Sequence, residues 1–200
     1  MHRAGGTATL RVMSSHSAQQ WFEKAEALRA RGDEAGALAA YSSAAEVARD
    51  LFDPALEARA MLAVGELKAL AEDLRGAREA FDEAIGRAME GGVPEVEADA
   101  WFAMASACFD SGISKDGHDA LLEAMALYRQ LADEAPENRE RKARLARAIH
   151  LYGEHLGVLG SESDARQALE LARIMYEELG DTAAVEGLRE EMRLLTEYSR

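Results

Sequence analysis

The 200-residue chain has a single cysteine, Cys108, and only three prolines. One cysteine excludes an internal disulfide, and no apolar run approaches the roughly 18 residues that a membrane-spanning helix needs. β-Branched residues are scarce too: Val, Ile and Thr number 7, 4 and 4, against 41 alanines and 23 leucines. Because alanine and leucine favour helices whereas β-branched residues fit sheets, the composition predicts an all-α protein.

Positive charge is also in short supply. The formal net charge is −14, and each half of the chain carries −7 (11 basic and 18 acidic residues, then 12 and 19). Since contacts to phosphates supply most of the non-specific affinity for nucleic acids, we expect no nucleic acid and no anionic membrane as a partner. The lone cysteine and the lack of a signal-peptide core in the first residues favour a cytoplasmic location.

Large and small side chains recur at an interval of 40 residues. Two series of large residues keep this interval: Trp21, Met61 and Trp101, and Tyr41, Phe81 and Leu121. Each member of the second series has a small residue four positions before it and an alanine three positions after it. Small, large and small side chains then share one helical face, where they let two helices approach closely. The pattern predicts repeated helical hairpins.

Turn signals divide each period into two helices. The hairpins are interrupted at Gly32-Asp33, Glu72-Asp73 and Gly112. Prolines suited to a first helical turn open the second and third periods at Pro54 and Pro94, and a fourth unit follows an insertion around Pro136. We therefore expect hairpins over residues 17–52, 53–92, 93–135 and 137–180, and a capping helix over residues 181–199.

The N-terminal residues 1–16 show no helical periodicity. Ser17 and Gln20 have the spacing of a capping box, which predicts that the first helix begins at Ser17. We expect residues 1–16 to form a disordered extension or to precede a true start at Met13.

In these residues the chain resembles the tetratricopeptide repeat (TPR) family, in a long-repeat form of about 40 residues. In that family a large residue begins the first helix of each hairpin and a small residue follows four positions later. The corresponding pairs are Trp21 and Ala25, Met61 and Gly65, Trp101 and Ala105, and Ile149 and Gly153. The resemblance implies a right-handed α-α superhelix of TPR-like helical hairpins with a C-terminal capping helix. Its small residues should be buried, above all Ala44, Gly65, Ala84, Ala105 and Gly153.

Histidine and cysteine offer little chemistry in this pattern. His150 and His155 are five residues apart, so on a helix they point in directions about 140° different and do not share a metal ion. Cys108 falls on the first helix of the third hairpin, where a thiol behaves as a small hydrophobe. We therefore predict no catalytic residue, no metal ligand and no cofactor, and we expect that the protein is not an enzyme.

One basic run lies early in the fourth hairpin and comprises Arg139, Arg141, Lys142, Arg144 and Arg147. Positive charge near a helix N-terminus is slightly unfavourable, so a compensating anion or acidic partner is one interpretation. A solvated face is the other, and we favour it.

The resemblance also implies a concave surface, lined by the first helix of each hairpin. On this surface the expected partner-binding residues form two rows. One row is apolar apart from a histidine and comprises Phe22, Leu62, Phe102 and His150. The other lies one helical turn further on, is mostly acidic, and comprises Glu26, Glu66, Ser106 and Glu154.

The extended surface of stacked hairpins and the lack of a catalytic constellation predict a non-catalytic protein-protein interaction module, or scaffold, that binds a partner peptide or helix in the concave groove. Phe102 is the expected central anchor, and the expected partner is a protein or peptide with apolar and basic residues. An equal alternative is that the glutamates only keep the surface soluble. The alternative function is a self-associating or regulatory helical-repeat protein that forms a homo-oligomer.

Overall fold

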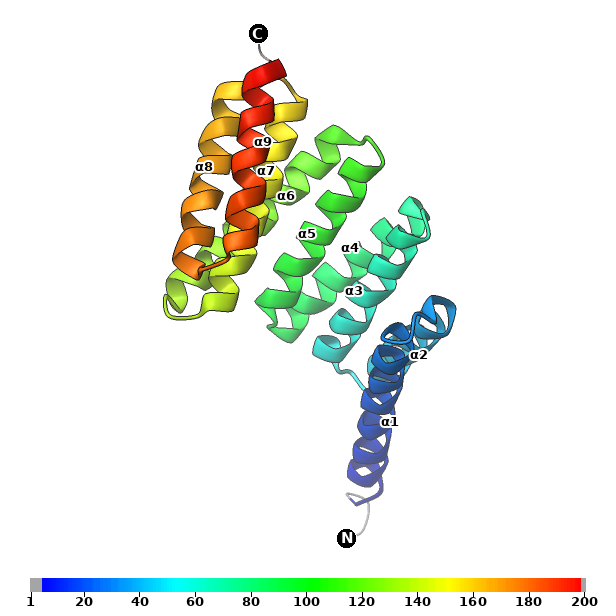
Figure 1. Cartoon of the computed structure of the whole chain (residues 1–200). Coiled ribbons are helices and arrows are strands. Elements are labelled where there is room, and N and C mark those ends of the chain that lie inside the picture. The colour runs from blue at the N-terminus through cyan, green and yellow to red at the C-terminus, as the bar shows by residue number, and fades with distance from the viewer. Residues whose placement is uncertain (1–4, 199–200) are drawn as a thin grey trace. The chain divides into compact units, whose positions relative to one another are not determined.

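A computed structural model describes the backbone of residues 5–198 and the side chains of residues 17–197. Over this backbone the chain forms nine helices and no strand (Figure 1). The helices are α1 (Gly5–Arg29), α2 (Glu34–Asp50), α3 (Pro54–Leu70), α4 (Leu74–Gly91), α5 (Pro94–Asp110), α6 (Ser114–Glu134), α7 (Arg139–Val158), α8 (Glu162–Leu179) and α9 (Thr182–Tyr198). None of them, within residues 5–198, combines the length and the apolar character needed to span a bilayer.

Aspartates at the expected turns start three of the helices. Asp33, Asp53 and Asp73 are the N-caps of α2, α3 and α4. Each carboxylate accepts a hydrogen bond from the backbone N–H three residues later, at distances of 2.9 to 3.1 Å. A side-chain cap satisfies an N–H group that the first helical turn leaves unpaired. The turn signals therefore place these helix starts correctly.

The helix start expected at Ser17 is wrong. Helix α1 begins at Gly5, so Ser17 and Gln20 lie inside the helix and the backbone of residues 5–16 is helical. Good helix formers upstream of Ser17, such as Leu10 and Met13, extend the helix without a cap at Ser17. For residues 1–4, the expectation of a disordered extension lies outside the described residues.

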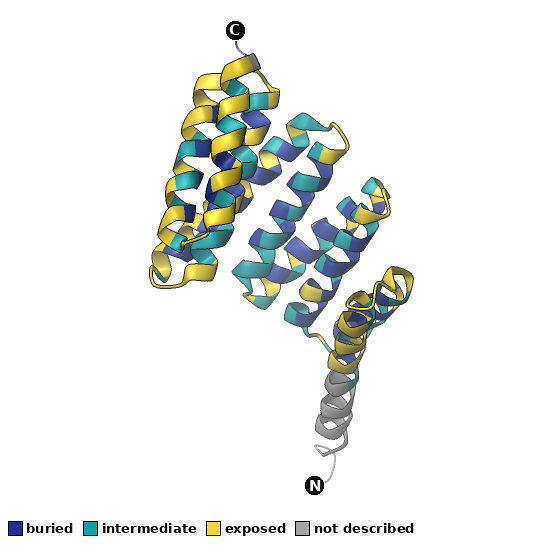
Figure 2. Cartoon of the chain, in the orientation of Figure 1, coloured by how far each residue is buried: buried dark blue, intermediate teal, exposed yellow. Residues whose placement is uncertain are grey.

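The chain divides into two compact units, residues 1–107 and 108–200, a division that the uniform period does not predict. In the first unit α1 packs against α2, α2 against α3, and α3 against α4. In the second unit α6 packs against α7, α7 against α8, and α8 against α9. Because the elements of a repeat protein contact mainly their neighbours, each unit has its own core. Figure 2 shows buried residues along the packed faces of both units.

The cores combine many alanines with a few large side chains. Tyr41 and Phe81 are fully buried in the first unit, and Leu121, Leu169 and Leu188 in the second. The residues expected to be small and buried are all buried: Ala44, Gly65, Ala84, Ala105 and Gly153. This confirms the helical register that the sequence predicts.

Two glycines bring paired helices especially close together. A Cβ atom on Gly65 of α3 would lie 2.4 Å from the Phe81 ring on α4. A Cβ atom on Gly153 of α7 would lie 2.7 Å from Leu169 on α8. Both distances are too short for real atoms, so each hairpin has its observed spacing because the first helix carries no side chain there.

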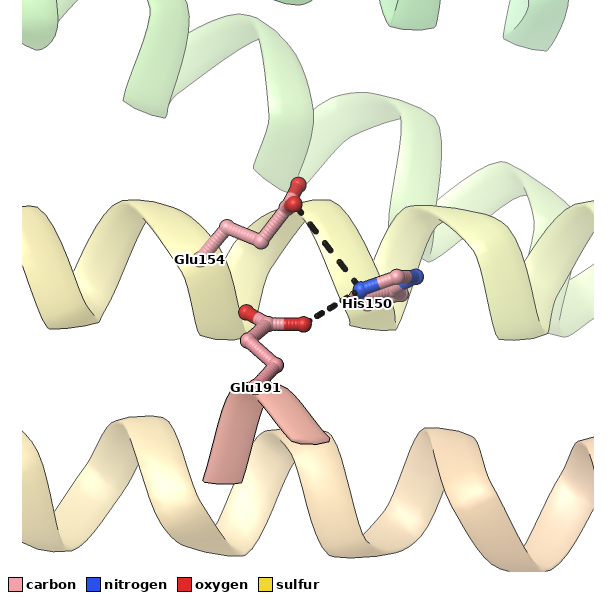
Figure 3. A group of neighbouring side chains, drawn as sticks. All are labelled: His150, Glu154 and Glu191. Atoms are coloured by element: carbon pink, nitrogen blue, oxygen red, sulfur yellow. Dashed lines mark hydrogen bonds and ion pairs between the residues drawn. The ribbon is translucent and has the colours of Figure 1, made fainter. Parts of the chain in front are cut away.

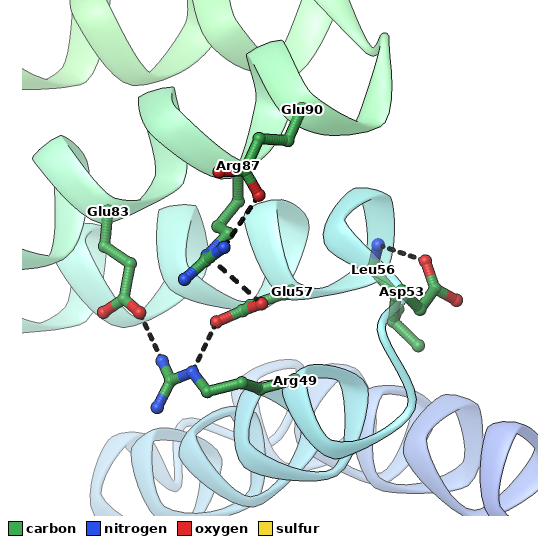
Figure 4. A network of polar contacts seen from close by, with 7 residues as sticks. All are labelled: Arg49, Asp53, Leu56, Glu57, Glu83, Arg87 and Glu90. Atoms are coloured by element: carbon green, nitrogen blue, oxygen red, sulfur yellow. Dashed lines mark hydrogen bonds and ion pairs between the residues drawn. The ribbon is translucent and has the colours of Figure 1, made fainter.

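A polar network joins α2, α3 and α4 in the first unit (Figure 4). Glu57 on α3 is only 2% exposed and bonds to Arg49 of α2 at 2.7 Å and to Arg87 of α4 at 3.3 Å. Arg49 also pairs with Glu83 of α4. The buried carboxylate is thus held between two guanidinium groups, as a buried charge requires.

Candidate functional site

In the first unit, the two apolar residues of the expected binding surface are half-buried. Phe22 of α1 sets its ring edge-on against Tyr41, with the ring centroids 5.3 Å apart and the planes at 70°. It also packs on the core cluster that includes Ala18 and Leu56. Leu62 of α3 is half-buried as well. Both side chains therefore contribute to the fold and leave only part of their surface for a partner.

The two glutamates of the same surface have partners within the protein. Glu26 accepts a hydrogen bond from the Tyr41 hydroxyl. Burial, and then this bond to a carboxylate, raise the pKa of Tyr41 to about 12, so the hydroxyl stays protonated and donates. Glu66 forms an ion pair with Arg29 of α1 at 2.8 Å. This surface is therefore less acidic than its glutamates alone suggest.

Phe102 is not available as a central anchor. The Phe102 residue is only 8% exposed. The Ser106 hydroxyl donates a hydrogen bond to the Phe102 carbonyl oxygen at 3.1 Å. Around the circumference of α5, Met104, Ala105 and Cys108 are buried too, so this helix is covered on more than one face. The expectation that the Phe102 ring faces a groove is corrected accordingly. Burial of Cys108 agrees with its reading as a core residue.

In the second unit, His150 and Glu154 of α7 meet a carboxylate that the sequence did not indicate. Glu191 of α9 places Oε2 2.9 Å from His150 Nε2, while Glu154 Oε1 lies 3.9 Å from the same nitrogen (Figure 3). The bond to Glu191 raises the pKa of His150. Burial, with the nearby charge of Glu191, raises the pKa of Glu154. One imidazole and two carboxylates form the group that suits a metal ion among the described side chains.

His155 points elsewhere, as its spacing from His150 predicts. Its ring is buried and stacks on Phe109, with the centroids 4.2 Å apart and the planes at 20°. The centroid of the His118 ring lies 5.5 Å from that of His155, and the His118 ring also contacts the ring of Tyr152. His118 Nδ1 and His155 Nε2 are buried without a hydrogen-bond partner. Burial, and secondarily His118, lower the pKa of His155, so it is a neutral core residue.

Comparisons with known proteins find the fold but no close relative. No family model matches the sequence, and no curated protein matches it. BtubC (BKLC) from P. vanneervenii is similar in structure, with a TM-score of 0.66 and 16% identity over 94% of this chain and 83% of that one. A putative kinesin light chain from P. anserina with nearly identical TPR-like repeats has a TM-score of 0.58 and 14% identity, and the match covers 94% of this chain and 98% of that one. A variant of that protein has a TM-score of 0.59 and 14% identity, and the match covers 93% of this chain and 97% of that one.

The chain has the fold of TPR-like helical repeat proteins. The predicted fold class, all-α with TPR-like hairpins and a C-terminal capping helix, is confirmed. In three of the hairpins an odd-numbered helix packs against the following even-numbered one: α1 with α2, α3 with α4, and α7 with α8. Helix α9 follows as the last described helix and packs against α8. The two rows expected on the first helices thus lie on α1, α3, α5 and α7.

Two arginines of the basic run donate hydrogen bonds to backbone carbonyl oxygens at the ends of neighbouring helices. Arg139 donates to the Leu179 carbonyl oxygen at the end of α8, and Arg141 donates to the Leu131 carbonyl oxygen in the last turn of α6 at 3.0 Å. Arg144 pairs with Glu140 at 2.8 Å. Cations are favourable near helix C-termini, where backbone carbonyls lack partners. The run is therefore neither a plain solvated face nor evidence for an anionic ligand.

Proposed function

We propose that this protein is a non-catalytic interaction module whose first unit binds a segment of a partner protein along α1 and α3. One observation carries the proposal: Phe22 and Leu62 are half-buried rather than buried, and they lie one turn from Glu26 and Glu66 on helices that contact each other. Partly exposed apolar groups beside carboxylates are a surface that a peptide can cover. The TPR-like fold, shared with a kinesin light chain, supports an interaction role.

The chemistry of the surface favours a partner segment with apolar and basic residues. Glu26 accepts a hydrogen bond from an uncharged hydroxyl, whereas Arg29 offsets the charge of Glu66. The side chains of Glu26, Glu66 and Arg29 together carry a formal charge of −1, and the whole chain carries −14. Long-range attraction therefore favours cationic segments, while apolar contacts with Phe22 and Leu62 supply affinity.

Selection from a random peptide library on the immobilised full chain tests this function. We expect enriched peptides that combine apolar residues with Lys or Arg and bind at micromolar affinity. Leu62→Ala and Glu26→Gln should each weaken the best peptide several-fold. Glu79→Gln is the matched control, because Glu79 is an exposed carboxylate on α4 that pairs only locally with Arg75. Failure to enrich any peptide, or equal binding by all variants, would refute the proposal.

Self-association is a second candidate function, favoured by exposed apolar side chains in the second unit. Leu171 and Ile174 of α8 are 44% and 42% exposed. They line a surface hollow of about 630 Å³ together with the polar residues Glu162, Arg166 and Glu170. Sedimentation over a wide concentration range distinguishes the two functions: a homo-oligomer should dissociate on dilution, and Leu171→Glu should abolish it. A monomer at every concentration would eliminate this candidate.

A further inference from the structure

Three side chains of the second unit converge in a way that suits a metal ion (Figure 3). His150 and Glu154 lie one turn apart on α7, and Glu191 reaches them from α9. Their nearest ligand atoms all lie within 4.8 Å of one another. The structure thus brings together a nitrogen and two carboxylate oxygens from two different helices.

The two distances from the imidazole nitrogen to the carboxylate oxygens match a shared coordination sphere. Metal-ligand bonds of about 2.0 to 2.2 Å place two ligand atoms of one ion roughly 3 to 4 Å apart, depending on the angle. His150 Nε2 lies 2.9 Å from Glu191 Oε2 and 3.9 Å from Glu154 Oε1. The side chains of both glutamates have several rotatable bonds, so we expect side-chain rotation to bring the three atoms onto one ion.

We infer that His150, Glu154 and Glu191 form a binding site for one divalent transition-metal ion, with Zn²⁺ as the best fit, which links α9 to α7. An imidazole among the ligands favours zinc and its neighbours over Mg²⁺ and Ca²⁺, which prefer oxygen ligands alone. Three protein ligands leave a fourth position for water.

The surroundings of the cluster support a cation. The two carboxylates carry −2 together, and burial, with the charge of Glu191, raises the pKa of Glu154. A bound cation relieves that repulsion. The His150 ring is also steadied from a third helix, because Tyr176 of α8 lies edge-on to it with the centroids 6.3 Å apart and the planes at 85°.

A link between α7 and α9 has a structural use. Helix α9 is the last of the described helices, and it packs against α8. Glu191 gives α9 a polar contact with His150 of α7. An ion held by this contact would fasten the cap to a second helix and stabilise the C-terminal end of the protein.

Calorimetric titration of the chelator-treated full chain with ZnCl₂ near neutral pH tests the inference. We expect one site per chain that binds Zn²⁺ at micromolar affinity or tighter and MgCl₂ and CaCl₂ at least about 100-fold more weakly. Saturating Zn²⁺ should raise the melting temperature by several degrees, because it binds the folded state. CoCl₂ should give visible absorption bands as a direct sign of coordination.

Variants assign the ion to these residues. Glu191→Gln keeps the size of the side chain and should weaken zinc binding at least about tenfold, as should His150→Ala. Glu186→Gln is the matched control, because Glu186 is an exposed carboxylate on the same helix. Circular dichroism without metal checks that each variant is folded. Absence of zinc binding by the natural chain overturns the inference, and so does binding that survives both Glu191→Gln and His150→Ala, which would assign zinc to other histidines.

Discussion

Replacing Gly65 by alanine should destabilise the protein, although alanine is normally the better residue in a helix. The new Cβ atom would lie 2.4 Å from Cε1 and 2.5 Å from Cδ1 of Phe81, about 1 Å short of ordinary contact. Phe81 is fully buried, so its ring has no free space to move into. Overpacking of this kind costs about 1 to 3 kcal/mol, which outweighs the roughly 0.5 to 1 kcal/mol that alanine contributes to a helix.

Gly86 supplies a matched control in the neighbouring helix. It lies inside α4, is exposed, and a Cβ atom there meets nothing within 4 Å. Gly86→Ala should therefore stabilise by about 0.5 to 1 kcal/mol. Thermal unfolding followed by circular dichroism should show Gly65→Ala melting about 2 to 8 °C below the natural chain and Gly86→Ala a few degrees above it.

The double variant Gly65→Ala, Phe81→Leu identifies the cause. Leucine occupies the corresponding position in later hairpins, as Leu121 and Leu169. If the ring causes the clash, the two substitutions together should cost less than the sum of their separate costs. A Gly65→Ala variant that melts as high as Gly86→Ala would refute this reasoning and show that α3 and α4 separate easily.

Three further perturbations test other parts of the structure by thermal or urea unfolding. Arg49→Ala should cost about 1 to 3 kcal/mol, and more than Glu57→Gln, because it leaves the buried Glu57 carboxylate with one guanidinium instead of two; equal losses would contradict the network. Asp73→Ala should cost about 1 kcal/mol by removing the N-cap of α4, with exposed Asp82→Ala as a control that changes little. The folded state lowers the pKa of His155, so the unfolded state takes up the proton first and stability is lost as the pH falls below the ordinary histidine value of about 6.5. As the pH falls from about 7 to 5, the melting temperature of His155→Phe should therefore rise relative to that of the natural chain. A difference that stays constant over this range would show that His155 titrates normally in the fold.

The local features of the fold could be predicted from the sequence because neighbouring residues determine them. Asp53 and Pro54 start a helix through their own hydrogen bond and backbone angle, whatever the rest of the chain does. The pairing of Gly65 with Phe81 follows from the position of each residue in its repeat. Helix α1 was placed less well, since nothing near Ser17 prevents the helix from continuing upstream.

The candidate sites depended on contacts between hairpins, which the sequence indicates only weakly. Arg29 and Glu66 are 37 residues apart, and His150 and Glu191 are 41 apart. Both separations are close to one period, so a search for opposite charges one repeat apart would have found them. Burial of Phe102 was not predictable in this way, because the groove position assigned from the family assumes that one face of α5 stays open.

The ion pair between Arg29 and Glu66 has a mechanical consequence. It joins α1 and α3, the first helices of two successive hairpins, and His150 and Glu191 likewise join α7 and α9. Such ion pairs oppose the separation of the two helices that they join, and salt weakens them by screening the charges. A cationic partner that pairs with Glu66 in place of Arg29 would break the ion pair between α1 and α3. Occupancy of the surface and local curvature of the first unit would then change together, so that a bound partner alters how readily the hairpins flex.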